Sequence, residues 1–180
     1  DALHDFAFQI LSSRLTHNNP ERRIQLINYL AKSLGHLGLV AGQSLDLLYE
    51  NKRNNIKKII KMYKLKTGSL FEFSFSSPFI LTNHPKEIIK FYRRYGLFFG
   101  LIFQIIDDLI DETKSFKLIG KTPGKDKKQG KSTLLDLMGK KNVISFCHDE
   151  INQFIKKNNN YFKKNLILKE LLKFNLTRIK

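Results

Sequence analysis

Three aspartates and a glutamine lie at helical spacing inside an otherwise apolar stretch of the chain. In the segment 104–111 (QIIDDLID), Gln104, Asp107, Asp108 and Asp111 follow one another at i, i+3, i+4 and i+7. On a helix, this spacing predicts one polar stripe that faces a single cavity. Carboxylates this close together need a cation, and their hard oxygens suit Mg²⁺ bridging to a phosphate. The alternative is the end of a helix that emerges into solvent.

A segment rich in lysine and glycine follows the acidic stretch. Residues 120–133 read GKTPGKDKKQGKST. Its lysines, Lys121, Lys125 and Lys131, can reach back over bound phosphates, and the glycines between them allow the backbone to come close. A nucleotide-binding P-loop is excluded, because it would need a glycine where Lys125 stands and a preceding strand. The alternative is an ordinary solvated loop.

The elements around these segments are all predicted to be helical. Apolar residues recur at helical spacing in Leu3–Leu15, in Pro20–Leu34 and from Asn54 onward. Pro78 and then Asn83-His84-Pro85 are expected to end this third helix. A long helix is expected over Lys86–Glu112, apolar nearly all round after Tyr95 and therefore central in the fold. Further helices are expected around residues 134–137, 143–156 and 166–174, with no strand anywhere.

Three glycines, Gly35, Gly38 and Gly42, recur every three or four residues after the second expected helix. Glycine lowers helix propensity, so a run of this kind is best explained by the close approach of another helix or a ligand.

Length and composition favour one compact helical domain over residues 1–180. The apolar fraction of 42% excludes a disordered chain, and the single Cys147 cannot form an internal disulfide. No uncharged run approaches the ~20 residues of a membrane span, so we expect a soluble, cytoplasmic protein. The net charge of +16 is spread over lysines mixed with Asn and Ile. This distribution is typical of a solvated face, and no nucleic-acid partner is expected.

Five blocks of the sequence occur in the order typical of a known family. They are Asp1-Ala2-Leu3 with Ala7-Phe8, residues 42–47 (GQSLDL), 66–70 (KTGSL), 100–111 (GLIFQIIDDLID) and 120–133. Together they resemble the trans-isoprenyl diphosphate synthases, the polyprenyl synthetases that include farnesyl and geranylgeranyl diphosphate synthases. The resemblance covers essentially the whole chain, and the forms K-T-G and G-Q-x-L-D are similar to the short-chain members.

The resemblance implies an all-α antiparallel helix bundle of the isoprenoid synthase type, in which magnesium ions hold the diphosphate of an allylic substrate. It implies a prenyltransferase that ionises this substrate to an allylic carbocation. Isopentenyl diphosphate then attacks, and loss of a proton gives farnesyl or geranylgeranyl diphosphate. The implied partners are the allylic diphosphate, isopentenyl diphosphate and a second copy of the chain in a homodimer.

The resemblance also assigns roles to individual residues. The metal ligands are Asp107, Asp108 and Asp111. Diphosphate oxygens are held by Lys66, Lys121 and Lys131, with hydrogen bonds from Thr67 and Gln104. The substrate cavity is lined by Gln43, Asp46 and Phe103, and Asp126 is an outer carboxylate. The catalytic set is Lys66, Thr67, Gln104 and Lys121. Taken singly, Gln43 with Asp46 would be an ordinary polar pair, and Lys66-Thr67 a surface turn.

One part of the family pattern has no counterpart in these residues. The first aspartate-rich motif should lie shortly before Asp1, and Asp1 and Asp5 do not replace it. We therefore expect a synthase lacking its N-terminal part, with impaired turnover because half of the metal ligands are missing. The alternatives are an inactive remnant or regulatory subunit, or a basic protein that binds nucleic acid or anionic lipid. Incompleteness should also expose apolar surface at 37–40 and 97–103.

Overall fold

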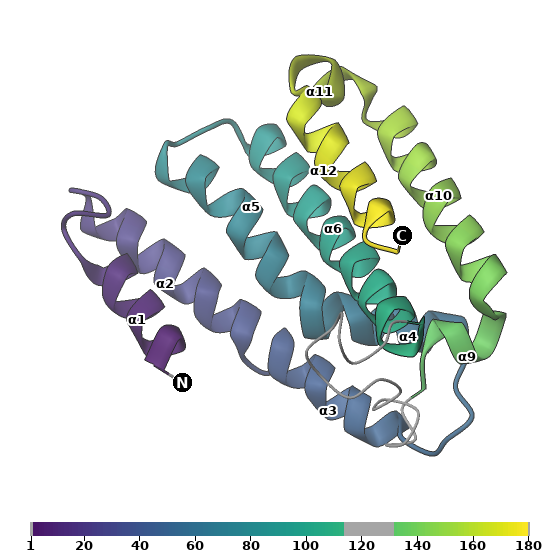
Figure 1. Ribbon diagram of the computed structural model, residues 1–180. Helices are drawn as coiled ribbons and strands as arrows, with labels where there is room; N and C mark the ends of the chain where they lie inside the picture. Colours follow the sequence, from purple (N-terminus) through teal and green to yellow (C-terminus); the bar gives the residue numbers. More distant parts are fainter. Residues whose placement is uncertain (1, 114–131, 180) are drawn as a thin grey trace. The chain divides into compact units, whose positions relative to one another are not determined.

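Every regular element in the described residues is helical, as the sequence predicts. The computed structural model describes residues 2–113 and 132–179 (Figure 1). The elements are α1 (Ala2–Ser12), α2 (Pro20–Leu34), α3 (Leu39–Tyr49), α4 (Ile56–Tyr63), η1 (Lys64–Gly68), α5 (Ser69–Leu81), α6 (Lys86–Thr113), α9 (Leu134–Met138), α10 (Lys140–Lys157), α11 (Asn159–Lys164) and α12 (Leu166–Thr177).

Local sequence sets where several helices begin. The side chain of Asn19 accepts a hydrogen bond of 2.8 Å from the backbone of Glu21, and Pro20 occupies the first turn of α2. Thr133 and Asp136 cap α9 reciprocally, each side chain bonding the other's backbone N–H. These caps satisfy amides that no helical carbonyl can reach.

The expected third helix contains two departures from the prediction. Residues 64–68 form η1, a π-helical turn with wider hydrogen bonding than the α-helix before and after it. Pro78 does not end the helix, because α5 continues to Leu81. Pro78 has no N–H to donate to the carbonyl of Ser74. That carbonyl oxygen instead lies 3.4 Å from the hydroxyl of Ser77. This side-chain donor compensates for the missing backbone donor.

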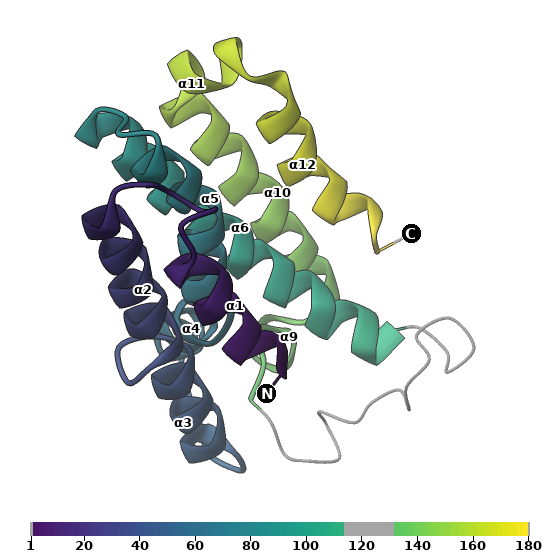
Figure 2. The same ribbon diagram turned by 90° about the vertical axis from the view of Figure 1, so that its left-hand side faces the viewer.

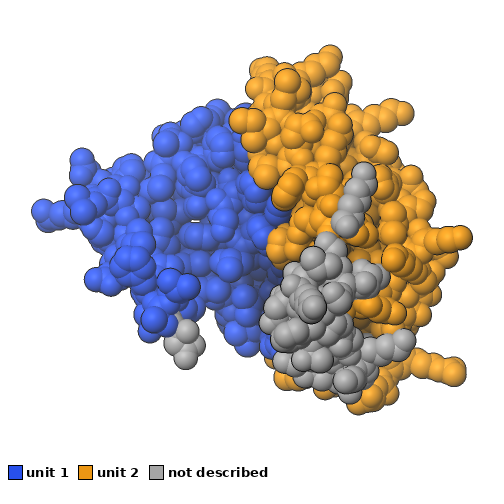
Figure 3. Space-filling model, in the orientation of Figure 1, with its two compact units in different colours: residues 1–43, 64–100 blue, residues 44–63, 101–180 orange. Residues whose placement is uncertain are grey.

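The chain divides into two compact units, residues 1–43 with 64–100 and residues 44–63 with 101–180 (Figure 3). In the first unit, α2 lies alongside α5, and α1 lies against α2 (Figures 1 and 2). Leu26, Leu30, Phe73 and Ile80 form the core between them. Ala7, Phe8 and Leu11 of α1 pack on this core. Leu3, Phe6 and Ile10 belong to the same helical spacing in Leu3–Leu15 but are exposed.

Glycines bring backbones into close contact in the first unit. A Cβ on Gly42 would lie 2.1 Å from the backbone nitrogen of Lys66, and one on Gly100 would lie 2.7 Å from the Cα of Gly68. Gly42 therefore confirms the predicted close approach. Gly35 and Gly38 lie instead in the turn between α2 and α3, where an added Cβ would lie 2.8 Å from the carbonyl oxygen of Ala31 and 2.0 Å from that of Ser33, both in α2.

The second unit packs α9 against α4 and α10, and α12 against α10 and α11. The structure adds α11, a short helix that the sequence pattern did not indicate. Cys147 is completely buried, and burial raises the pKa of its thiol to about 12. Such a thiol stays protonated at neutral pH and packs as a small apolar residue.

Burial agrees with the expected central position of α6. Tyr95, Ile102, Ile106 and Leu109 are all completely buried. The exposed surface predicted at 97–103 is therefore wrong, because this stretch is covered within the chain itself. At 37–40 the prediction is confirmed, with Leu37 61% and Val40 53% exposed.

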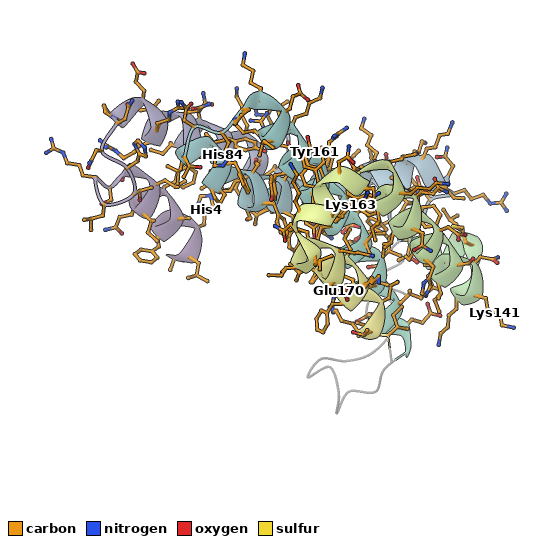
Figure 4. The ribbon with its side chains drawn as sticks, turned by 90° about the horizontal axis from the view of Figure 1, so that it is seen from above. His4, His84, Lys141, Tyr161, Lys163 and Glu170 are labelled. Carbon is orange, nitrogen blue, oxygen red and sulfur yellow. The ribbon has the colours of Figure 1, made fainter. Side chains whose placement is uncertain are left out.

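Charged side chains occupy the outside of both units. Figure 4 shows nitrogen-bearing side chains projecting outward from the helices, with Lys141 at the start of α10 among them. No helix in the described ranges is long and apolar enough to cross a membrane.

Candidate active site

The aspartates of α6 do not share one set of partners. Asp107 lies beside Arg178, with Nη2 of the arginine 2.9 Å from Oδ1 of the aspartate. Asp108 accepts hydrogen bonds from Gln104 Nε2 at 2.8 Å and from the hydroxyl of Tyr63. The adjacent carboxylates thus point to different neighbours, as expected for residues about 100° apart on a helix. The aspartates predicted to form one stripe therefore have two different sets of neighbours.

Asp108 is buried and hydrogen-bonded in the described structure. It is 9% exposed, and its two oxygens receive hydrogen bonds from α4 and from its own helix. The Tyr63 oxygen also accepts a bond of 3.3 Å from the backbone N–H of Leu134. Burial, together with the negative charge of Asp108, raises the pKa of Tyr63 well above its ordinary value. Tyr63 therefore remains a donor at physiological pH.

Asp111 differs from both of its neighbours. It is only 5% exposed, and it makes no hydrogen bond or ion pair with any residue in the ranges 2–113 and 132–179. Its oxygens are not fully enclosed, so water or a cation can reach this carboxylate. Asp111 lies one helical turn from Asp107, so the two can face one ligand.

This donor set fits a magnesium ion that takes part of its coordination from a substrate. Mg²⁺ in enzymes is commonly held by one or two carboxylates together with phosphates and water. Asp107 and Asp111 supply such a pair. The described residues contain no group of three or more His, Cys, Asp or Glu side chains that could hold a metal ion. The assignment of Asp108 as a third ligand stays a prediction.

Lys66 and Thr67 lie in η1 and line a pocket of the first unit. Its volume is about 230 Å³, and the other lining residues are Leu39, Leu70, Phe71 and Ser74. Most of the wall is apolar, and Lys66 and Thr67 add an ammonium group and a hydroxyl group to it. Such a pocket suits a molecule with an apolar body and an anionic end. Gly42 allows α3 to approach the backbone of Lys66 and so helps to form this region.

The other predicted site residues have varied surroundings. Gln43 is exposed, while Asp46, three residues later on α3, is 5% exposed. Phe103 is half-buried, and the guanidinium of Arg178 lies 4.3 Å from the centre of its ring. Lys121, Lys131 and Asp126 lie outside the described residues. Their predicted contacts with a diphosphate remain untested.

Two residues of this region were missed by the sequence reasoning. Arg178 is 71 residues from Asp107, and nothing in the local pattern pairs them. Tyr63 lies at one of the helically spaced apolar positions that follow Asn54. A tyrosine in a core position needs a partner for its hydroxyl, and this requirement alone would have directed attention to a nearby polar group.

Comparison with known proteins identifies the family. Residues 1–171 match the profile described as Polyprenyl synthetase. The chain belongs to this family. It is 36% identical over 154 residues to the farnesyl diphosphate synthase of Micrococcus luteus, a match covering 85% of this chain and 52% of that enzyme. It is 38% identical over 122 residues to geranylgeranyl pyrophosphate synthase 4 of Arabidopsis thaliana, covering 66% of this chain and 33% of the relative.

Solved structures of the family show the same helical fold. The geranyltransferase of Helicobacter pylori, complexed with magnesium and isoprenyl diphosphate, superposes with a TM-score of 0.83 at 26% identity. That match covers 98% of this chain and 57% of the other. An apo FPP/GFPP synthase from Zymomonas mobilis gives a TM-score of 0.78 at 30% identity, with 98% and 58% coverage. The chain thus spans about half the length of relatives of the short-chain type.

Proposed function

We propose that this chain forms part of a short-chain prenyl diphosphate synthase that joins isopentenyl diphosphate to an allylic diphosphate. The product is farnesyl or geranylgeranyl diphosphate. The observation that carries the proposal is the pair Asp107 and Asp111, one turn apart on α6, with Asp111 buried and lacking a partner among the described residues. In a chain of this family, such a pair is suited to magnesium and diphosphate.

Each group has a defined task in the proposed reaction. Magnesium supplies charge stabilisation for the departing diphosphate when bound. Asp107 and Asp111 hold the ion, and Lys66 binds a diphosphate oxygen, with Thr67 and Gln104 as hydrogen-bond donors. The apolar wall formed by residues such as Leu70 and Phe71 accommodates the hydrocarbon part of the substrate. Lys121 and Lys131 are proposed as further diphosphate ligands, and a homodimer is the proposed assembly.

The 180 residues alone are expected to have little turnover. Asp107 and Asp108 are the only adjacent aspartates in the sequence, whereas the family pattern has two aspartate-rich motifs. With half of the carboxylates missing, the charge that develops on the leaving group lacks stabilisation. An inactive remnant of a synthase remains the competing hypothesis.

A condensation assay with radiolabelled isopentenyl diphosphate and Mg²⁺ tests the proposal. We expect no product from the 180 residues alone, and product when a segment carrying the family's first aspartate-rich motif is joined before Asp1 to restore the family pattern. In the restored protein, Asp107→Asn should lower kcat by about 100-fold or more, since it removes a charged group that acts on the transition state. Exposed Asp149→Asn on α10 is the matched control and should leave the rate unchanged. A restored, folded protein without activity contradicts the proposal and favours the remnant.

A further inference from the structure

The guanidinium of Arg178 is held at Asp107 by two different contacts. Its Nη2 lies 2.9 Å from Asp107 Oδ1, and its Cζ lies 4.3 Å from the centre of the Phe103 ring. The side chains of Arg178 and Asp107 are 24% and 38% exposed. A carboxylate on one side and an aromatic face on the other define the position of the cation. Arg178 directly follows α12, so the end of this helix is tied to α6.

The charges around this pair are unevenly distributed. Asp107 has an arginine at one oxygen, while Asp111, one turn further along α6, has no ion-pair partner among the described residues. Arginine stays protonated throughout the physiological pH range, so its positive charge at Asp107 is permanent. The first of the two carboxylates is therefore already neutralised, and the second is not.

We propose that Arg178 is the resident counter-ion of Asp107 and competes with a divalent metal for this carboxylate. The inference rests on the proposed function to the extent that it takes Asp107 as a metal ligand. A second cation at the same carboxylate is repelled by the guanidinium if Arg178 stays in place. If Arg178 moves away, the ion pair and the contact with Phe103 are lost. In both cases the presence of Arg178 weakens metal binding.

The competition also acts in the opposite direction. Two ligands that disfavour each other at one site do so by the same factor in each direction. A metal at Asp107 therefore weakens the attachment of Arg178, and with it the tie between the end of α12 and α6. When a metal ion binds, Asp107 thus exchanges the guanidinium of Arg178 for that ion, while Asp111 gains a cation that it lacks in the described structure.

Manganese binding tests this proposal. It is measured, with and without inorganic pyrophosphate, from the loss of the electron paramagnetic resonance signal of free Mn²⁺. Arg178→Met keeps a long apolar side chain against Phe103 but removes the charge. It should raise Mn²⁺ affinity about tenfold, within the usual range for coupled sites. Arg178→Lys keeps the charge and should bind Mn²⁺ within about threefold of the parent chain. Circular dichroism checks that each variant is folded.

Two further variants make the result specific. Lys173 lies on α12, the helix that precedes Arg178, and pairs with Glu170. Lys173→Gln removes one positive charge there and should leave Mn²⁺ affinity unchanged. In an Asp107→Asn background, Arg178→Met should no longer raise the affinity. Equal or weaker Mn²⁺ binding by Arg178→Met overturns the role of Arg178 but leaves the proposed function intact. Absence of Mn²⁺ binding by every variant, pyrophosphate included, overturns both.

Discussion

The hydroxyl of Tyr63 on α4 donates a hydrogen bond to Oδ2 of Asp108 on α6. The hydroxyl oxygen of Tyr63 also accepts a hydrogen bond from the backbone N–H of Leu134, the first residue of α9. One phenolic oxygen therefore links three helices of the second unit. Because Tyr63 is 3% exposed, water cannot easily replace it in either bond.

Tyr63→Phe should destabilise the chain without creating a large cavity. It leaves a buried carboxylate oxygen and a backbone N–H without their partner, so the free energy of unfolding should fall by about 1–3 kcal/mol. Urea denaturation measures the change. Tyr92→Phe is the control, since the ring of Tyr92 stacks on Phe79 at 3.7 Å between centroids and does not depend on its hydroxyl. Equal stability of the two variants would contradict the importance of the three-helix link.

Buried tyrosines should make the fold sensitive to alkaline pH. Burial, the largest cause, raises the pKa of Tyr29 to about 12, and the pKa of Tyr95 is also raised by burial. An unfolded tyrosine ionises at a pKa of about 10. Above pH 10 the unfolded state therefore binds fewer protons than the folded state, and the free energy of unfolding falls as pH rises. Below pH 10 this contribution is fully present.

Urea unfolding of the parent chain and of Tyr29→Phe between pH 9 and 12 measures this contribution. Lysine titration changes the free energy of unfolding of both proteins equally, so the difference between them reports Tyr29. The variant should start less stable, since Tyr29 Oη bonds Glu72 at 3.1 Å and Ser76 at 3.2 Å. It should then lose less stability than the parent as pH rises. Parallel curves would show that Tyr29 does not contribute to the pH dependence.

Gly42→Ala should disturb the position of Lys66. The added Cβ would lie 2.1 Å from the nitrogen and 2.4 Å from the Cα of Lys66, and backbone atoms cannot move aside as a flexible side chain can. We expect a loss of stability on the order of 3 kcal/mol, at the upper end for overpacking. Leu47→Ala on the same helix removes a 59% exposed side chain and should change stability by less than about 0.5 kcal/mol. Thermal unfolding of both variants makes the comparison.

The outer face of α12 should bind hydrophobic dyes. Leu166, Ile167 and Phe174 are 65%, 73% and 60% exposed, and they line one groove of about 510 Å³. Contiguous apolar surface of this kind favours association. The double variant Ile167→Gln with Phe174→Gln should lower anilinonaphthalene sulfonate fluorescence and self-association, measured by light scattering. Leu15→Gln, at a side chain 98% exposed outside the groove, should change either signal far less.

Much of the helical architecture can be predicted from the sequence, because helix periodicity and helix ends are local properties. The 28-residue helix α6 was expected over Lys86–Glu112 and is found over Lys86–Thr113. Pro78 shows the limit of local rules, because α5 continues through it to Leu81. The hydroxyl of Ser77 lies 3.4 Å from the carbonyl oxygen of Ser74, which Pro78 leaves without a backbone donor. On α1, apolar residues occur on more than one face, so periodicity could not decide which face is buried.

The sequence predicts which residue types gather at the candidate site but not which residues they contact. Spacing places the acidic residues on one helix, as α6 shows, yet it treats Asp107 and Asp108 as equivalent. Their separate partners, Arg178 and Tyr63, come from helices 71 and 45 residues away in sequence. Contacts over such distances depend on how helices pack, and a single sequence does not contain that information.

The π-helical turn at 64–68 determines where this part of the chain can tolerate a change of length. A π turn contains about one residue more than an α turn. Removal of that residue would leave one α turn in its place, so the side chains of α5 would keep their orientation, and Phe73 and Ile80 would stay in the core that they share with α2. A deletion inside α5 itself would instead rotate every following side chain by about 100°. We therefore expect homologous chains to accept a single-residue deletion in η1 far more readily than one in α5.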